Sequence, residues 1–474
     1  RAQAKAGGKP LFLVAEVDRK SYTGKLWLGA PEIQLADWLE LAPQWNPPKL
    51  YARSKLDLWA DLTQRRISRV HSRLDIKQLS FRRPAQKKLF AFGTEPALFD
   101  RISVESHWRR RVDGWDLNIP AIVFESRNQE RLVSDIRVHA GQGRWQAKAA
   151  AVDVSALAAL NPALIRQLPK VHAWLRNADL SGRFSRLKAH GDVGRNAWTI
   201  SGKAEGLGMA AIGKSPGFQD VAGVFMADQS GGTFKFKQSE PVLVWPVSFG
   251  RNIPGKIDGA VLWWKSSADW LVAAKDLRWQ GDGMQADVDM QLQFHQDGRK
   301  PMLNVAARLA PFGFDTAKRF WLRHIMPSNS IRWLDMALEQ GQIRDASIVI
   351  AGNLGNWPFS DKTGRFSARA TILAESFKFA ADWPAAEQAV LQADFNGPGF
   401  SVIGEAMYLG NRLTLKPSGM QRFSETELVI DVASETSMQA LMPVLNNTPL
   451  KQKLGEAVYS LQGEGPARVG VNLF

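Results

Sequence analysis

The sequence contains no cysteine, and only seven of its 474 residues are histidines. The absence of thiols excludes disulfide bridges, thiolate metal sites and cysteine nucleophiles. None of the histidines falls in an HxH or HExxH spacing, so no metal site is predicted. The glycine pair Gly206-Leu207-Gly208 runs into Met209-Ala210-Ala211 rather than into a phosphate-binding turn. No nucleophile, base and electrophilic support are recognised together, so we expect neither an enzyme nor a cofactor.

Long hydrophobic runs are also lacking. No apolar stretch approaches the roughly 20 residues that a membrane-spanning helix needs. The first residues, Arg1 to Val17, resemble neither a signal peptide nor a start with methionine. We therefore expect a fragment of a longer protein, with any anchor or export signal outside it.

The composition is that of a folded protein with an uneven positive charge. Hydrophobic residues make up 45% of the chain and charged residues 23%, with a net charge of +15. Residues 1–140 hold 25 basic and 16 acidic side chains, whereas residues 363–474 hold 9 and 11. Such a balance indicates an anionic partner, such as nucleic acid, a membrane surface or an acidic polymer, and places the basic surface in the first part of the chain.

Alternation of apolar and polar side chains is the commonest local pattern. It is clearest from Asp287 to Phe294, where every second side chain is apolar. A period of two residues indicates a β-strand with one apolar and one polar face. Clusters such as Gly281-Asp282-Gly283 separate these stretches and predict tight turns between antiparallel strands.

These strands and turns predict a mainly β protein: a long, curved antiparallel β-sheet with a few short helical insertions. The apolar faces of successive strands would then form an open hydrophobic groove, and an ordinary closed core between two sheets is the alternative. The side chains expected to line the groove follow from the alternation alone: Phe234, Phe236, Val288, Met290, Leu292, Phe294, Phe377, Phe379, Leu413 and Leu415.

Three segments with helical character share one layout. Each has a first helix rich in leucine or methionine, then a proline, then a second short helix and a strand. They span residues 153–178, 315–340 and 437–461. The repetition predicts a basic β-segment over 1–150, two β-groove repeats over 151–314 and 315–433, and the truncated start of a further repeat over 434–474.

One of these regions resembles the YhdP branch of the AsmA-like family. That family carries a proline, a Trp-Leu-Asp or Trp-Leu-Asn on a short helix, a turn with glycine, and a strand that ends before a Phe/Trp-Pro-Phe corner. Met326–Gly341 and Ile350–Phe359 match this pattern, and Lys55–Ala60 is similar to a strand further upstream. The motif positions, which the resemblance makes structural rather than catalytic, are Pro327, Trp333, Leu334, Gly352, Trp357, Pro358 and Phe359.

The resemblance implies a periplasmic protein that is tethered to the inner membrane by an N-terminal helix absent from this sequence. It implies a repeating β-groove that carries phospholipid toward the outer membrane and supports envelope integrity. The implied partners are phospholipids, both membranes and further envelope proteins, with no nucleic acid, cofactor or metal. The positive charge keeps a second hypothesis open, a non-catalytic binding or scaffold module for an anionic envelope polymer.

Overall fold

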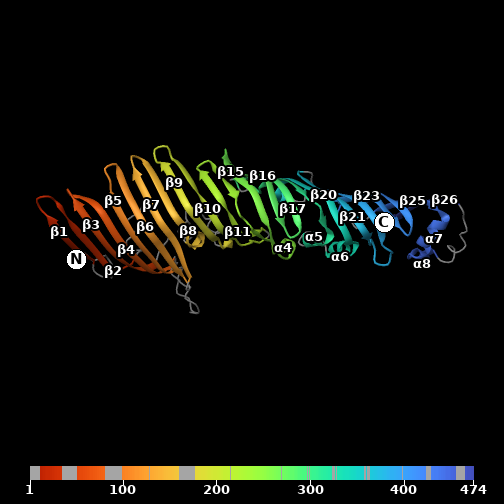
Figure 1. Ribbon diagram of the computed structural model, residues 1–474, viewed down its shortest axis with the longest axis horizontal. Coiled ribbons are helices and arrows are strands. Elements are labelled where there is room, and N and C mark those ends of the chain that lie inside the picture. Colours follow the sequence, from red (N-terminus) through yellow and green to blue (C-terminus); the bar gives the residue numbers. More distant parts are fainter. Residues whose placement is uncertain are drawn as a thin grey trace. The chain divides into compact units, whose positions relative to one another are not determined.

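Figure 1 shows a computed structural model of the chain. The structure describes residues 11–34, 51–80, 99–126, 129–159, 177–213, 215–267, 269–295, 297, 299–322, 326, 328–356, 359, 363–397, 399–422, 429–454 and 465–473. The chain divides into two compact units, unit 1 (Arg1–Ser239) and unit 2 (Glu240–Phe474), and each is described by itself.

Unit 1 is an antiparallel meander in which each strand pairs with the next strand in the sequence (Figure 1). Among the residues that the structure describes, the first strand pairs with the second alone, so the sheet stays open at this end. The strands are β1 (Phe12–Asp18), β2 (Thr23–Gln34), β3 (Tyr51–Thr63), β4 (Arg66–Ser80), β5 (Phe99–Arg110), β6 (Gly114–Ser126), β7 (Gln129–Gly141), β8 (Arg144–Asp153), β9 (Ser181–Asp192), β10 (Ala197–Met209), β11 (Gly217–Asp228) and β12 (Gly231–Phe236).

Unit 2 begins with a short hairpin around the helix α4 (Pro246–Phe249) and continues as a second antiparallel meander. In the described part of the chain the last strand pairs with the one before it alone, so this sheet is open as well. The strands are β13 (Val242–Val244), β14 (Asn252–Pro254), β15 (Lys256–Ser266), β16 (Asp269–Gly281), β17 (Met284–Phe294), β18 (Met302–Leu309), β19 (Phe312–Gly313), β20 (Leu338–Asn353), β21 (Arg365–Phe377), β22 (Ala386–Asn396), β23 (Gly399–Tyr408), β24 (Asn411–Met420), β25 (Ile430–Ser437) and β26 (Pro466–Leu473).

Tight turns join many of these strands, and their backbone explains their sequence. Asp282 and Gly283 connect β16 to β17 with φ angles of 54° and 82°. Gly281 pairs with Met284 directly before and after them. Two positive φ values in succession favour Asp-Gly, because glycine adopts them without steric cost. The turn predicted here is confirmed.

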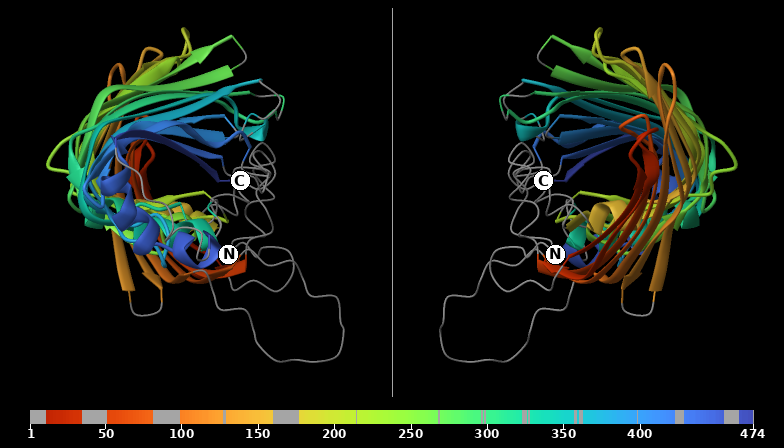
Figure 2. Two further views of the ribbon diagram at one scale, coloured as in Figure 1. Left: turned by 90° about the vertical axis from the view of Figure 1, so that its right-hand side faces the viewer. Right: turned by 90° about the vertical axis from the view of Figure 1, so that its left-hand side faces the viewer.

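β-Bulges interrupt many strands and bend them. In β16 the pairing shifts between Ala274 and Leu277, where Asp276 has a φ of 54° and its backbone N–H donates to Asp289 Oδ1 at 2.8 Å. A bulge adds one residue to one strand, which bends it and increases its twist. Figure 2 shows the strands curving along their length, as the predicted fold requires. Other non-glycine residues with positive φ inside strands are Gln78, Asp135, Arg186, Asp220, Asp345 and Gln388.

Short helices begin where the helical segments were predicted. In unit 1, α2 (Val154–Ala159) follows β8, and Asp153 Oδ1 accepts hydrogen bonds from the backbone N–H groups of Ser155 (2.8 Å) and Ala156 (3.2 Å). This is the usual N-cap arrangement, which satisfies backbone donors that a helix start leaves free.

Unit 2 holds the helical segments that precede β20 and β26. The helix before β20 ends at Ala337 rather than at the predicted Gln340, because Leu338 already pairs with Phe377 in the sheet. These helices are α5 (Phe314–Arg319), α6 (Ser328–Ala337), α7 (Met438–Asn446) and α8 (Leu450–Leu454), and a 3-10 turn, η3 (Leu354–Asn356), follows β20. The repeat boundaries expected at residues 151, 315 and 434 remain predictions.

Candidate functional site

Unit 1 has one apolar face, and that face is only partly buried. Phe99 is fully buried, and its ring centroid lies 5.2 Å from that of Phe124. Trp198 and Trp145 both pair with Gly191, so they lie on one face, and Ala149 on the same side of β8 packs against the buried centre. Trp198 is nevertheless 39% exposed. The buried centre of the face comprises Leu79, Phe99, Ile102, Phe124, Val133, Val152 and Ala156.

Phe234 and Phe236 lie on the same apolar face of unit 1. Phe234 pairs with Phe225, and the ring of Phe225 lies 5.2 Å from that of Phe184, which packs against the buried centre. The rings of Phe234 and Phe236 lie 5.1 Å apart, and both side chains are half-buried. The structure therefore continues the apolar face to the last strand of the unit.

The apolar face of unit 2 contains the four residues predicted on β17. Val288, Met290 and Leu292 are half-buried and Phe294 is 42% exposed, whereas Gln291 lies on the opposite, exposed side. Pairing with the neighbouring strands produces unbroken apolar rows across the sheet. These rows are Val272–Leu292–Leu303 and Ala274–Met290–Val305–Ile350.

The remaining predicted lining residues lie near the helices of unit 2. Phe377 and Leu415 pack against a buried cluster that includes Phe314 of α5. Leu413 is half-buried on β24. Phe379 lies beyond the end of β21, with its ring 5.6 Å from that of Trp383 and 5.9 Å from that of Tyr408. Phe379 therefore contacts other aromatic rings, and its predicted place on a strand is wrong, because β21 ends at Phe377.

The motif positions that the structure describes are packing residues. Trp333 donates its Nε1–H to the carbonyl of Phe379 at 2.8 Å, and Leu334 packs against the buried cluster of unit 2. Gly352 has a φ of 150°, and a Cβ there would lie 2.7 Å from the ring of Phe359, which is buried. Only glycine allows this close approach. Pro327, Trp357 and Pro358 lie outside the described residues.

The other face of unit 1 is polar and crossed by ion pairs. Arg101 lies 2.7 Å from Asp75, and Arg183 lies 2.6 Å from Glu205. Hydrogen bonds from Ser185 and Arg183 hold the pKa of Glu205 below its usual value. Bonds with His139 and Arg111 do the same for the pKa of Asp116. These pairs are exposed, so each contributes about 0–1 kcal/mol to stability.

A stack of rings crosses this polar face on β3, β4 and β5. The ring of His71 lies 5.0 Å from that of Trp59 and 4.5 Å from that of His107. A hydrogen bond with His71 (2.9 Å) lowers the pKa of Glu105, and Arg73, at 3.5 Å, lowers it further. His71, Glu105 and His107 hold ligand atoms within 4.8 Å of one another. The two imidazoles are nearly parallel rather than convergent, and Arg73 repels a cation, so we assign no metal here.

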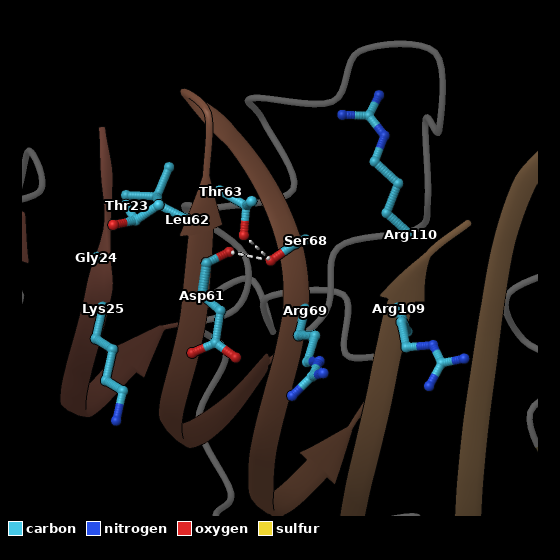
Figure 3. A pocket seen from close by; sticks show the side chains of 10 residues that line it. All are labelled: Thr23, Gly24, Lys25, Asp61, Leu62, Thr63, Ser68, Arg69, Arg109 and Arg110. Carbon is cyan, nitrogen blue, oxygen red and sulfur yellow. Dashed lines mark hydrogen bonds between the residues drawn. The ribbon is translucent and has the colours of Figure 1, made fainter. Parts of the chain in front are cut away.

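A hollow at one edge of unit 1 was not predicted from the sequence. Figure 3 shows Asp61, Arg69 and Arg109 side by side on three neighbouring strands, with Lys25 beside them on a fourth and Arg110 projecting the other way. The hollow has a volume of about 570 Å³. The only sequence signal was the run from His107 to Arg111, in which aromatic and basic residues are mixed.

One segment matches the sequence patterns of two enzyme motifs. Gly208–Ser215 matches the P-loop pattern, and Gly213–Gly217 matches the pattern of a nucleophile elbow. Both chemistries need a strand followed by a helix. Here β10 leads into β11, and Ile212 and Ser215 pair with each other in a short bridge. The described residues on either side of Lys214 therefore lack the setting that either motif needs.

In the part of the chain that the structure describes, no helix is both long and apolar enough to cross a membrane.

Comparison with known proteins identifies a relative of this chain. An intermembrane phospholipid transporter of Escherichia coli (strain K12), YhdP, is 24% identical over 218 residues, which cover 44% of this chain and 17% of the relative. The chain thus corresponds to a small part of the length of that protein. No solved structure matches the chain significantly.

A family model, described as YhdP protein, matches residues 2–474. The match includes both units and the motif around Trp333 and Gly352. It agrees with the open antiparallel sheet, the partly exposed apolar faces and the resemblance noted in the sequence. The chain therefore belongs to the YhdP protein family.

Proposed function

We propose that this chain is a section of a protein that carries phospholipid between the two membranes of a bacterial envelope, along the apolar face of its sheet. The observation that carries the proposal is the set of apolar rows on unit 2, in which Met290 and Leu292 remain partly exposed. A closed core would bury these side chains. An acyl chain would cover them, as would a second protein layer.

The energetics support an acyl chain as the occupant. Burial of apolar groups contributes about 0.8 kcal/mol per CH₂, so a tail of sixteen carbons would gain on the order of 12 kcal/mol on a continuous lining. A break in the lining would return part of the tail to water. Unbroken rows of apolar side chains are therefore the property that transport needs.

The relative supports the same substrate and place. Its name describes an intermembrane phospholipid transporter. For this chain we propose the periplasm, with a tether to the inner membrane supplied by another part of the protein and further envelope proteins at its ends. No reaction is proposed, because the apolar rows contain no group that could act as an acid, base or nucleophile.

The experiment compares two neighbouring positions on β17. A photo-crosslinking residue at Met290 should capture phospholipid in living cells, and the same residue at Gln291, on the exposed side, should capture little. Phospholipid should also co-purify with the chain. Equal capture at both positions, or none at Met290, contradicts the proposal.

The second hypothesis, an anionic polymer as ligand, predicts a different result. Polymer binding would use the polar face, so it would fall steeply with salt and would survive a charge introduced among the apolar rows. Retention of all binding in such a variant, with no lipid in the purified protein, would favour the polymer.

A further inference from the structure

One edge of unit 1 gathers the short turns of the meander. Because the strands alternate in direction, every turn from an odd-numbered to an even-numbered strand lies at the same edge. The turns at residues 19–22, 64–65, 111–113 and 142–143 belong to it. The helix α2 and the link from β10 to β11 lie at the other edge.

This edge, here called the basic edge, is rich in cations. Some acidic residues beside it serve the turns: Asp18 accepts the backbone N–H of Lys20 at 3.0 Å, and Asp192 accepts that of Arg195 at 3.1 Å. Asp116 and Asp192 also form ion pairs with Arg111 and Arg144. The basic edge comprises Arg19, Lys20, Lys25, Arg65, Arg66, Arg69, Arg109, Arg110, Arg111, Arg144 and Arg195.

The hollow of Figure 3 lies at the basic edge and is lined by several cations. Lys25, Asp61, Arg69 and Arg109 are successive partners across β2, β3, β4 and β5, so their side chains are neighbours on one face. Within the described residues, none of these three cations, nor Arg110, makes an ion pair. These three cations lie on the polar face beside Asp61, Asp116 follows Arg109 in the row and pairs with Arg111, and Arg110 projects from the apolar face. The edge therefore carries unpaired cations on both faces, which favours an anion there.

The side chains of β5 change in polarity from the sheet centre to this edge. Along the apolar face they run from Val104 through Ser106 and Trp108 to Arg110, and Ser106 shares a hydrogen bond of 2.7 Å with Ser72. A phospholipid has the same order of chemistry, from acyl chain through ester groups to phosphate. Tryptophan is the side chain best suited to the boundary between the apolar and the charged part.

The turn at Gln64 and Arg65 keeps a cation at this edge although its backbone conformation is strained. Gln64 and Arg65 have φ angles of 48° and 63°, whereas the similar turns at 142–143 and 282–283 have glycine in the second position. Arg65 keeps its side chain there, with its guanidinium carbon 3.7 Å from the centre of the Tyr22 ring. A side chain at positive φ is strained, and glycine would relieve the strain.

We propose that the basic edge binds the phosphate of a phospholipid whose acyl chains lie on the apolar face of unit 1. Arg110, which ends the apolar row of β5, is the direct contact, and Arg69 and Arg109, on the polar face of the same edge, add positive charge beside it. This inference rests on the proposed function and adds to it a place for the headgroup. It predicts preference for phosphate-bearing lipids, and for those with net negative charge above zwitterionic ones.

The test uses the full chain and a triple variant, Arg69→Gln, Arg109→Gln and Arg110→Gln. The matched control removes three arginines from the polar face of unit 2, Arg278→Gln, Arg369→Gln and Arg412→Gln, each of which lies in an ion pair. Circular dichroism checks folding. A second triple variant with lysine at the same three positions of unit 1 keeps the charge and should bind nearly as the parent does.

Binding is measured with short-chain phosphatidylglycerol, diacylglycerol and inorganic phosphate as probes. We expect the glutamine variant to bind phosphatidylglycerol about tenfold more weakly, while the control and the binding of diacylglycerol stay unchanged. Unchanged affinity of the glutamine variant for phosphatidylglycerol overturns the inference. Equal competition by inorganic phosphate also overturns it, because the site would then be a general anion site.

The two proposals fail in different ways. If the parent chain binds neither phosphatidylglycerol nor diacylglycerol, the proposed function itself is wrong. If it binds both lipids equally and the glutamine variant does the same, lipid transport stands and the headgroup site alone is rejected.

Discussion

The two units share a fold but differ in charge. Both are open antiparallel meanders with bulged strands and one apolar face. Unit 1 holds 38 basic and 22 acidic side chains, whereas unit 2 holds 23 and 24. Since unit 2 builds the same sheet without excess charge, the fold does not need the charge of unit 1. That charge is therefore available for binding.

The contrast is sharpest at the turns. In unit 1 the turns of the basic edge hold residues such as Arg19 and Arg65, whereas Arg111 pairs with Asp116. In unit 2, Asp297 and Arg299 pair with each other within one turn, and Gly397 follows β22 without a charged neighbour in the described residues. The turn at Arg65 thus carries a cation where the turn at Gly397 carries none.

The largest effects are expected from the buried centres, which the two units have in common. Phe99→Ala in unit 1 and Phe314→Ala in unit 2 should each lower the free energy of unfolding by about 3–5 kcal/mol, because both side chains are almost fully buried. Chemical unfolding followed by tryptophan fluorescence measures this.

If the units unfold separately, each variant should move only one of two transitions. Val17→Ala, at an exposed position, serves as the control and should change little. A loss below about 1 kcal/mol for Phe99→Ala would show that the apolar face of unit 1 does not have the packed centre described.

A charge on the apolar face of unit 2 tests whether lipid passes over this unit as well as over the apolar face of unit 1. Leu292→Asp should lower phospholipid transfer between vesicles at least about tenfold, because a carboxylate in an apolar path must lose water or force the lipid away. Gln291→Asp, on the exposed side of the same strand, should leave transfer within about twofold. Similar transfer rates in both variants would show that lipid does not pass over β17.

These comparisons also show what could be predicted from the sequence. The strand β17 could be predicted, because a period of two residues between Asp287 and Phe294 is a local signal. The polar row at the basic edge could not be predicted; it consists of Lys25, Asp61, Arg69 and Arg109. Its members lie on four strands, and only the register of the pairing makes them neighbours.

Register itself depends on features that the sequence hides. The bulges at Gln78 and Arg186 use residue types that do not favour positive φ, so nothing in the local sequence marks them. Each bulge reverses which side chains share a face beyond it. Helix positions were easier, since a stretch rich in leucine or methionine followed by a proline is a local signal. The end at Ala337 is set by pairing of the next residue with a distant strand.

A smaller effect is expected from acid, which should lower the stability of unit 1 more than that of unit 2. The pKa values of Glu105, Asp116 and Glu205 are lowered by partners on the same or neighbouring strands, whereas that of Asp297 in unit 2 is lowered within its own turn. A carboxylate with a lowered pKa in the folded state stabilises fully above its unfolded pKa of about 4, and this contribution disappears as pH falls through the lower folded value.

Calorimetry at pH 5 and pH 3 measures this difference. These groups are exposed, so each contributes at most about 1 kcal/mol, and 1 kcal/mol corresponds to about 2–4 °C for a unit of this size. Glu105→Gln should reduce the acid-induced loss, while Glu375→Gln, an exposed glutamate of unit 2, should not. An equal effect of the two variants contradicts the assignment to cross-strand pairs.

The smallest change in stability is expected at the turn that holds Arg65, where it separates folding from binding. Arg65→Gly relieves a positive φ worth about 1–2 kcal/mol but loses the contact with Tyr22, worth about 0.5–1 kcal/mol, and adds freedom to the unfolded chain. The net change should stay within about 1 kcal/mol, while affinity for phosphatidylglycerol falls. The reverse change, Gly410→Arg in unit 2, should cost about 1–2 kcal/mol without raising that affinity, because Gly410 has a φ of 82° and no basic edge beside it. If Arg65→Gly leaves lipid affinity unchanged and raises stability, Arg65 only strains the turn and has no binding role. The difference in charge between the units would then have no function at this turn.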